Sequence, residues 1–208
     1  MEILARMLPM YEQLYSQITD ALVNDGYIVV EQALRKELPS AMTALLQDET
    51  HFKKAGISGA GDLHLDAQRR RDKTQWLEAD FGVQSEFLDF AEGLRVYLNR
   101  ALYLGLSYYE SHFAIYEEGD FYEKHFDTFK GFKNRVVTTV YYLNEGYKEE
   151  DGGALNVYDA NENFLKKVLP HANTLVVFLS EKFPHEVLAA RKKRYSVAGW
   201  FRVDKRAR

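Results

Sequence analysis

The spacing of apolar residues changes near residue 107, and this change limits the folds that are open to the chain. After it, apolar and polar residues alternate, which is the pattern of half-buried strands. Turns rich in Gly, Asn and Asp separate the alternating runs, which give candidate strands at 110–116, 135–143, 154–158, 174–179 and 194–203. The sequence therefore predicts a mostly β fold with helices packed on one face (α+β), in which the strands build a double-stranded β-helix, or jelly roll.

The residues before this change predict helices that support the sheet. In 9–24 apolar residues recur at four-residue spacing, and Asn24-Asp25-Gly26 ends that helix. A short strand at 27–30 and a second helix at about 32–52 follow.

A long loop is expected next, at 53–76, and long loops are often functional. It contains several glycines and the run Arg69-Arg70-Arg71, and it ends at Trp76. A third helix is predicted over 86–104, with Ser85 as its N-cap. Its apolar stripe consists of Leu88, Ala91, Leu94, Leu98 and Leu102.

Length and composition exclude several classes of protein. The 208 residues, 46% of them hydrophobic, suffice for a single domain over 1–208, with 1–106 as mainly helical support and 107–203 as the jelly-roll core. A net charge of −4 argues against a nucleic-acid partner. The absence of cysteine excludes disulfides and thiolate chemistry. Because no signal segment or membrane span is visible, we expect a cytoplasmic protein without a membrane partner.

Two histidines and one aspartate form a candidate metal site. His125 and Asp127 are separated by one residue, and His185 lies far downstream. Side chains at i and i+2 of an extended segment point to the same side, so the first two can reach one ion. Two histidines and one carboxylate are the facial triad of non-haem Fe(II) sites, which leaves coordination positions open.

The last predicted strand presents a pocket wall. Arg194, Ser196, Ala198 and Trp200 alternate on one face, whereas the other face is apolar and suited to packing on helices. The small residues leave room, and a guanidinium can bind a carboxylate with two parallel hydrogen bonds.

The spacing of His125, Asp127, His185 and Arg194 resembles that of the 2-oxoglutarate and Fe(II)-dependent dioxygenases, and within them the oxygen-sensing prolyl hydroxylases and their bacterial relatives. The resemblance implies that His125, Asp127 and His185 bind Fe(II). It implies that Arg194 binds the distal carboxylate of 2-oxoglutarate. Further co-substrate contacts are implied for Tyr142, Tyr116, Leu155 and Trp200, with O2 as the second co-substrate and ascorbate as a supporting cofactor.

The same resemblance implies where a polypeptide substrate binds. The segment Arg70–Trp76 is similar to the mobile loop that closes over the target proline, and substrate contacts are implied for Arg70, Asp72, Tyr122 and Arg135. Two features depart from the animal enzymes. The segment from Tyr116 to His125 is one residue shorter, and Arg71 stands where those enzymes carry a glycine.

The resulting hypothesis is hydroxylation of a prolyl residue in a protein, with elongation factor Tu as the target and succinate and CO2 as co-products. One alternative is a 2-oxoglutarate oxygenase acting on a small molecule or another non-prolyl substrate. Others are a non-catalytic jelly-roll binding module and a zinc hydrolase, although a hydrolase leaves Arg194 and Tyr142 unexplained. The remaining histidines are expected to be structural or exposed: His51, His64, His112 and His171.

Overall fold

The computed structural model describes residues 2–59, 62–64, 68–79, 82–128 and 134–203. Its helices are α1 (Glu2–Asn24), α2 (Leu38–Ala44) and α3 (Val83–Leu102), with short 3-10 turns η1 (Leu45–Gln47) and η2 (Glu149–Asp151). Its strands are β1 (Tyr27–Val30), β2 (Lys53–Lys54), β3 (Ile57–Gly59), β4 (Asp62–His64), β5 (Lys73–Trp76), β6 (Tyr108–Tyr116), β7 (Tyr122–His125), β8 (Arg135–Tyr142), β9 (Leu155–Tyr158), β10 (Phe164–Val168), β11 (Leu175–Leu179), β12 (His185–Val187) and β13 (Arg194–Arg202).

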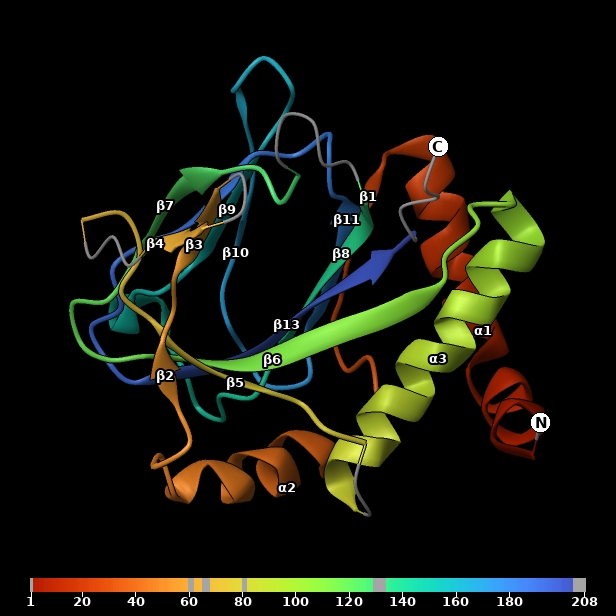
Figure 1. The fold of residues 1–208 in the computed structure, drawn as a ribbon, viewed down its shortest axis with the longest axis horizontal. Helices are drawn as coiled ribbons and strands as arrows, with labels where there is room; N and C mark the ends of the chain where they lie inside the picture. Colours follow the sequence, from red (N-terminus) through yellow and green to blue (C-terminus); the bar gives the residue numbers. More distant parts are fainter. Residues whose placement is uncertain (1, 60–61, 65–67, 80–81, 129–133, 204–208) are drawn as a thin grey trace.

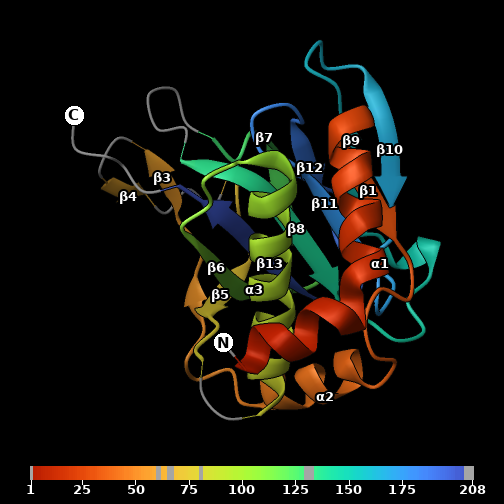
Figure 2. The same ribbon diagram turned by 90° about the vertical axis from the view of Figure 1, so that its right-hand side faces the viewer.

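Two antiparallel sheets face each other, as the jelly-roll prediction requires. The larger has the strand order β1-β11-β8-β13-β6-β5-β2, and the smaller has the order β10-β9-β12-β7. Helices α1 and α3 pack on each other and cover the outer face of the larger sheet (Figures 1 and 2). A separate hairpin pairs β3 with β4.

The alternation of β13 divides the hydrophobic core in two. Val197 and Phe201 belong to the cluster between the larger sheet and the helices. The opposite face of the same strand looks towards the smaller sheet, where a second cluster includes Tyr142, Leu155 and Val187. The predicted division of this strand into a helix-packing face and a pocket face is confirmed.

The helix predictions are right in position but not at every boundary. Helix α1 ends at Asn24 as expected, and Gly26 follows with a positive φ of 82°. Helix α3 begins at Val83 after Gly82, so the assignment of Ser85 as N-cap is wrong. In the predicted stripe Leu88 and Leu102 are only partly buried, and the phenylalanines at 87 and 90 fill the core instead.

The predicted helix at 32–52 is much shorter than expected. Gln32 has a positive φ of 51°, which interrupts helical geometry. Asn173 then holds Leu34 from both sides, accepting a hydrogen bond from its backbone N–H and donating one to its carbonyl, each at 2.9 Å. The helix α2 starts only at Leu38, where Pro39 suits the first turn.

The segment 53–76 is not the continuous loop that the sequence suggested. It contains β2 to β5, and β5 pairs with β6 inside the larger sheet. For Lys73–Trp76, the prediction of a mobile loop is therefore replaced by a sheet strand. Strands β7, β10 and β12 were also missed, because they are short or, in β10, exposed along most of an edge.

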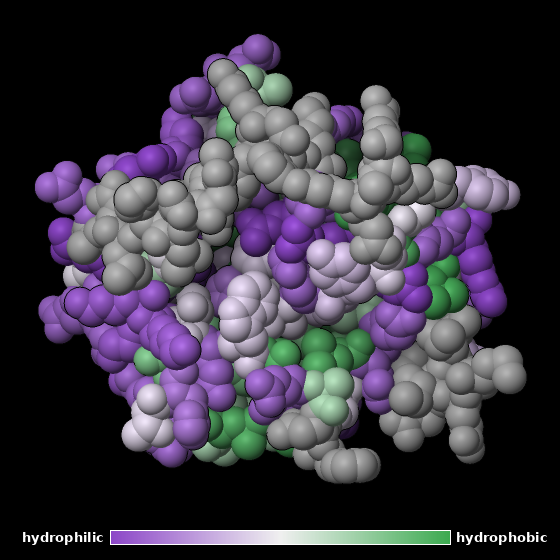
Figure 3. Space-filling view, viewed as in Figure 1, coloured by the Kyte–Doolittle hydropathy of each residue, from purple (hydrophilic) through white to green (hydrophobic). Residues whose placement is uncertain are grey.

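Hydrophilic side chains cover the molecule on the side of β2, whereas a smaller hydrophobic strip shows towards α2 (Figure 3). None of the helices in the described ranges is both long and apolar enough to cross a membrane.

Candidate metal centre and co-substrate pocket

His125, Asp127 and His185 converge between the two sheets. Strands β7 and β12 pair with His125 directly opposite His185, and the rings of the two histidines are 4.4 Å apart. Asp127 follows β7 and lies with one carboxylate oxygen 3.8 Å from His125 Nε2 and the other 3.6 Å from His185 Nε2. One ligand atom from each residue lies within 4.8 Å of the others, and this is the group in the described ranges that could hold a metal ion.

Backbone carbonyls set the tautomers of both histidines. His125 Nδ1 is 2.7 Å from the carbonyl of Glu123, and His185 Nδ1 is 3.1 Å from the carbonyl of Phe183. Because a carbonyl only accepts, each Nδ1 carries the proton, and each Nε2 keeps a lone pair directed to the centre. Tyr122 stacks on His125 with ring centres 3.6 Å apart, which fixes its plane.

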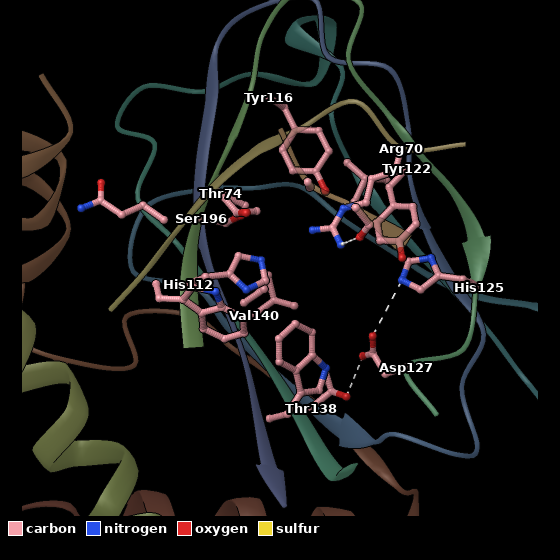
Figure 4. Close-up of a pocket in the computed structure, with 18 of the residues that line it drawn as sticks. Arg70, Thr74, His112, Tyr116, Tyr122, His125, Asp127, Thr138, Val140 and Ser196 are labelled. Atoms are coloured by element: carbon pink, nitrogen blue, oxygen red, sulfur yellow. Dashed lines mark hydrogen bonds and ion pairs between the residues drawn. The ribbon is translucent and has the colours of Figure 1, made fainter. Parts of the chain in front are cut away.

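Asp127 is held by the buried hydroxyl of Thr138. Thr138 Oγ1 donates a 2.7 Å hydrogen bond to Asp127 Oδ2 (Figure 4). The same Oγ1 is 2.8 Å from the hydroxyl of Ser180. Burial raises the pKa of Asp127, but the nearby His185, His125 and Arg135 outweigh it and keep that pKa below its ordinary value. Burial, followed by the proximity of His185, lowers the pKa of His125 to about 3. Asp127 and His125 are therefore in the protonation states that bind a cation.

A buried cation marks the other end of the cavity. Arg194 is 1% exposed, and its guanidinium carbon lies 4.7 Å and 5.0 Å from the ring centres of Tyr116 and Tyr142. Its Nη1 donates to Ser196 Oγ at 3.1 Å. Arg194 Nε and Tyr142 Oη are buried with no hydrogen-bond partner in the described part of the chain. A buried guanidinium with an unused N–H donor, such as that of Arg194, favours an anionic ligand beside it.

The triad and this cation line one cavity of about 660 Å³. Leu155 and Trp200, both implied as co-substrate contacts, also line it. Three ligands on one side of a metal fit the set expected for Fe(II), and the unpaired donors of Arg194 and Tyr142 fit a carboxylate. The residues present therefore match both Fe(II) and 2-oxoglutarate.

Three of the four residues implied for substrate contact line the same cavity. Arg70 forms a bidentate ion pair with the fully buried Asp72, with distances of 2.6 Å and 2.9 Å. The Arg70 guanidinium also lies 4.6 Å from the ring centre of Tyr122. Arg70 and Tyr122 line the cavity, but Asp72 does not, so its contact is with Arg70.

Arg135 completes the wall near the metal ligands. Its guanidinium carbon lies 3.7 Å from the ring centre of Trp200, and its Nη2 lies 3.6 Å from a carboxylate oxygen of Glu110. Its Nη1 donates a long 3.4 Å hydrogen bond to the carbonyl of Asp127.

The structure adds a histidine that the sequence did not place at the site. His112, expected to be structural or exposed, lines the cavity (Figure 4). It lies on β6 four residues before Tyr116, so the alternation of that strand puts both on one face. That alternation is the sequence signal that could have placed His112 on the same face as Tyr116. His51 also lines the rim, and His171 is exposed, whereas the side chain of His64 lies outside the described residues.

Comparison with known proteins agrees with this geometry. Residues 111–202 match the 2OG-Fe(II) oxygenase superfamily. A prolyl-4-hydroxylase from Pseudomonas putida is 34% identical, with a TM-score of 0.84 over 91% of this chain and 99% of that one. A Trichoplax adhaerens prolyl hydroxylase, solved with a hypoxia inducible factor peptide, has the same fold at 22% identity and a TM-score of 0.79.

Animal relatives match over a shorter stretch. The Caenorhabditis elegans hypoxia-inducible factor prolyl hydroxylase is 36% identical over 98 residues, which are 46% of this chain and 13% of that protein. Human Egl nine homolog 1 is 34% identical over 93 residues, 43% of this chain and 22% of that protein. The chain therefore spans only a small part of these curated relatives. Together with the likeness to the Pseudomonas putida structure along nearly its whole length, these matches show that the chain belongs to the prolyl hydroxylases of the 2OG-Fe(II) oxygenase superfamily.

Proposed function

We propose that this protein hydroxylates a prolyl residue of a polypeptide, using Fe(II), 2-oxoglutarate and O2, the cofactor and co-substrates of its family. One oxygen atom of O2 enters the prolyl side chain and the other enters succinate, while 2-oxoglutarate loses CO2. The observation that carries the proposal is that the triad and Arg194 line one cavity, with the unpaired hydroxyl of Tyr142 on a ring packed against Arg194.

The side chains of the cavity have different roles at its different ends. When bound, Fe(II) with 2-oxoglutarate and O2 supplies the oxidising chemistry. His125, Asp127 and His185 would hold the metal from one side and leave its other positions free for co-substrates. Arg194 and Tyr142 would donate to the distal carboxylate and thereby orient the co-substrate. The apolar wall that includes Leu155 and Val187 limits the entry of water.

As the target we propose elongation factor Tu, within the cytoplasm. Support comes from the resemblance to bacterial prolyl hydroxylases and from the likeness to the Pseudomonas putida enzyme. The proposal of a polypeptide target is supported by the Trichoplax adhaerens relative, which was solved with a peptide.

The test has two stages. Addition of 2-oxoglutarate to the Fe(II) protein without O2 should produce the visible charge-transfer band of the chelate, and no band from folded protein would contradict the oxygenase assignment. Incubation with elongation factor Tu under air should then add the mass of one oxygen atom to a proline-containing peptide, measured by mass spectrometry. His125→Ala is the inactive control. Succinate formation without any modified protein, even in a whole lysate, would contradict a protein target.

A further inference from the structure

His112 is a buried histidine whose hydrogen-bonding capacity is unused within the described residues. It is 4% exposed, and neither Nδ1 nor Nε2 has a partner. A buried polar group without a partner is costly, so its retention in a ligand cavity points to a ligand group. None of the roles assigned above to the triad, Arg194 or Tyr142 uses it.

Two tryptophans enclose the imidazole of His112. The ring centres of Trp76 and Trp200 each lie 5.3 Å from that of His112. Trp200 is 6% exposed, whereas Trp76 is 55% exposed, so Trp76 is the neighbour that can turn aside easily. The residue opposite His112 on β13 is Ala198, whose methyl group leaves space on the cavity side.

The place of His112 in the sheet separates it from the co-substrate carboxylate. Arg194 pairs with Tyr116, and Ala198 pairs with His112, four residues along the same pair of strands. At about 3.3 Å for each residue, these two positions of the strand pair are roughly 13 Å apart. His112 instead lies towards β5 and β2, where exposed Lys53 and Lys54 form the cavity rim. A polymer substrate can enter at that rim.

The chemistry of His112 matches a peptide group. Burial, followed by the proximity of Arg70 and Arg135, lowers the pKa of His112 to about 3. At neutral pH the ring is therefore uncharged and offers one N–H donor and one lone pair. A peptide that contains proline lacks the amide N–H at that residue and keeps its carbonyl, so the backbone near the target has an unmatched acceptor.

We propose that His112 is a specificity-determining residue that donates a hydrogen bond to a main-chain carbonyl of the polypeptide substrate, close to the target proline. Trp76 turns aside when the substrate enters and then packs against it. This inference rests on the proposed function, because it names a contact within that substrate complex.

The first experiment measures peptide binding without turnover. A library of blocked peptides with a central proline is screened against the protein with Mn(II) and 2-oxoglutarate in the absence of O2. His112→Met keeps the bulk but removes the donor, and should raise the Kd of the bound peptides about tenfold, which corresponds to about 1.4 kcal/mol. His112→Asn places an amide near the position of Nδ1 and His112→Gln near that of Nε2, and one of the two should restore binding. The exposed His171→Met is the matched control.

A second experiment identifies the carbonyl. Each secondary amide of a bound peptide is replaced in turn by an ester, which weakens the preceding carbonyl as an acceptor and removes one N–H. At one position the ester should weaken binding to the wild type but not to His112→Met, and this non-additivity reports direct coupling. Purely additive effects at every position would overturn the proposed hydrogen bond.

The outcomes separate this inference from the proposed function. If His112→Met lowers the Tm but leaves peptide Kd unchanged, His112 is satisfied by a buried water and has a structural role, and the inference is overturned while hydroxylation stands. The 2-oxoglutarate Kd should be the same in all variants. If His112→Met weakens the binding of 2-oxoglutarate as much as that of the peptide, the cavity is generally damaged and the inference is also overturned. If no peptide in the library binds the wild type, both the inference and the proposal of a polypeptide target are contradicted. The chelate band then still tests the oxygenase assignment separately.

Discussion

At the scale of single residues, the cavity is defined by polar atoms that the protein itself leaves unpaired. Arg194 is nearly fully buried, yet its charge faces tyrosine rings and a serine hydroxyl rather than a carboxylate. The tyrosine faces offset part of the cost of burying the cation. A bound dicarboxylate would supply the missing counter-charge.

Replacing Arg194 by lysine should therefore weaken 2-oxoglutarate binding. Lysine keeps the charge but loses the planar pair of donors, so the Kd should rise at least about tenfold while metal affinity stays the same. Titration of the anaerobic chelate band measures both. The control is Arg191→Lys, at an exposed position on the same loop, and an equal loss in the control would show that the effect is not specific to the pocket.

The hydroxyl of Thr138 should matter for the metal through Asp127. Thr138→Val removes the donor to Asp127 Oδ2 at almost constant volume, and losses of such a supporting hydrogen bond typically lower metal affinity about 10–100-fold. The neighbouring Thr139→Val is a matched control, since Thr139 is equally buried but bonds to Tyr109 on the other face of β8. Competition with a metal-binding dye measures the difference, and equal affinities for the two variants would contradict the assigned role.

At the scale of elements, the turn before β9 shapes the pocket through its backbone. Gly153 has a φ of +62°, and a Cβ there would lie 2.9 Å from Arg194 Cδ and 3.0 Å from Tyr147 Oη. The turn therefore needs glycine for its conformation and also for the close approach of Arg194. Because Leu155 of β9 pairs with Val187 and Val157 pairs with His185, the turn lies at the Arg194 end of these strands, away from His185.

Gly153→Ala should consequently weaken 2-oxoglutarate binding as well as lower stability. Gly146→Ala is a matched control, because Gly146 has a φ of +61° but a methyl group added there would meet no atom within 4 Å. Backbone strain of about 1–2 kcal/mol is expected in both variants, whereas only Gly153→Ala should displace Arg194. Urea unfolding and co-substrate titration separate the two effects, and identical 2-oxoglutarate affinities would contradict the steric argument.

At the scale of the whole molecule, the cavity makes stability depend on pH. The pKa of His112 is lowered from an ordinary value of about 6.5 to about 3 by burial and then by two arginines. Between these values the unfolded chain binds a proton that the folded chain does not, so folding stability decreases as the pH falls. Above about pH 6.5 this contribution no longer changes.

Lowering the pH from 7.5 to 5 should cost about 2 kcal/mol through His112 alone. Urea unfolding of the metal-free protein at both pH values measures the total loss. Over the same pH interval, the free energy of unfolding of His112→Met should fall by about 2 kcal/mol less than that of the wild type. This difference isolates His112 from the other titrating groups. Equal losses in the two proteins would show that His112 is protonated in the folded state.

The sequence determined those features that depend on local patterns. The alternation after residue 107 is sufficient to predict five strands and the two faces of β13, because the side-chain direction in a strand follows from position alone. Four-residue spacing likewise located α1 and α3. The H-x-D pair, His185 and Arg194 indicated the chemistry, since few metal sites use that ligand set.

Tertiary structure decided which of these patterns meet. The pairing of His125 with His185, the hydroxyl of Thr138 on Asp127 and the placing of Lys73–Trp76 in the sheet all join segments far apart in the chain. His112 shows the limit most clearly, because its strand and face were readable but its position between Trp76 and Trp200 was not. Strand order depends on the long-range packing of the two sheets, so the pattern within one strand does not reveal which strands become its neighbours.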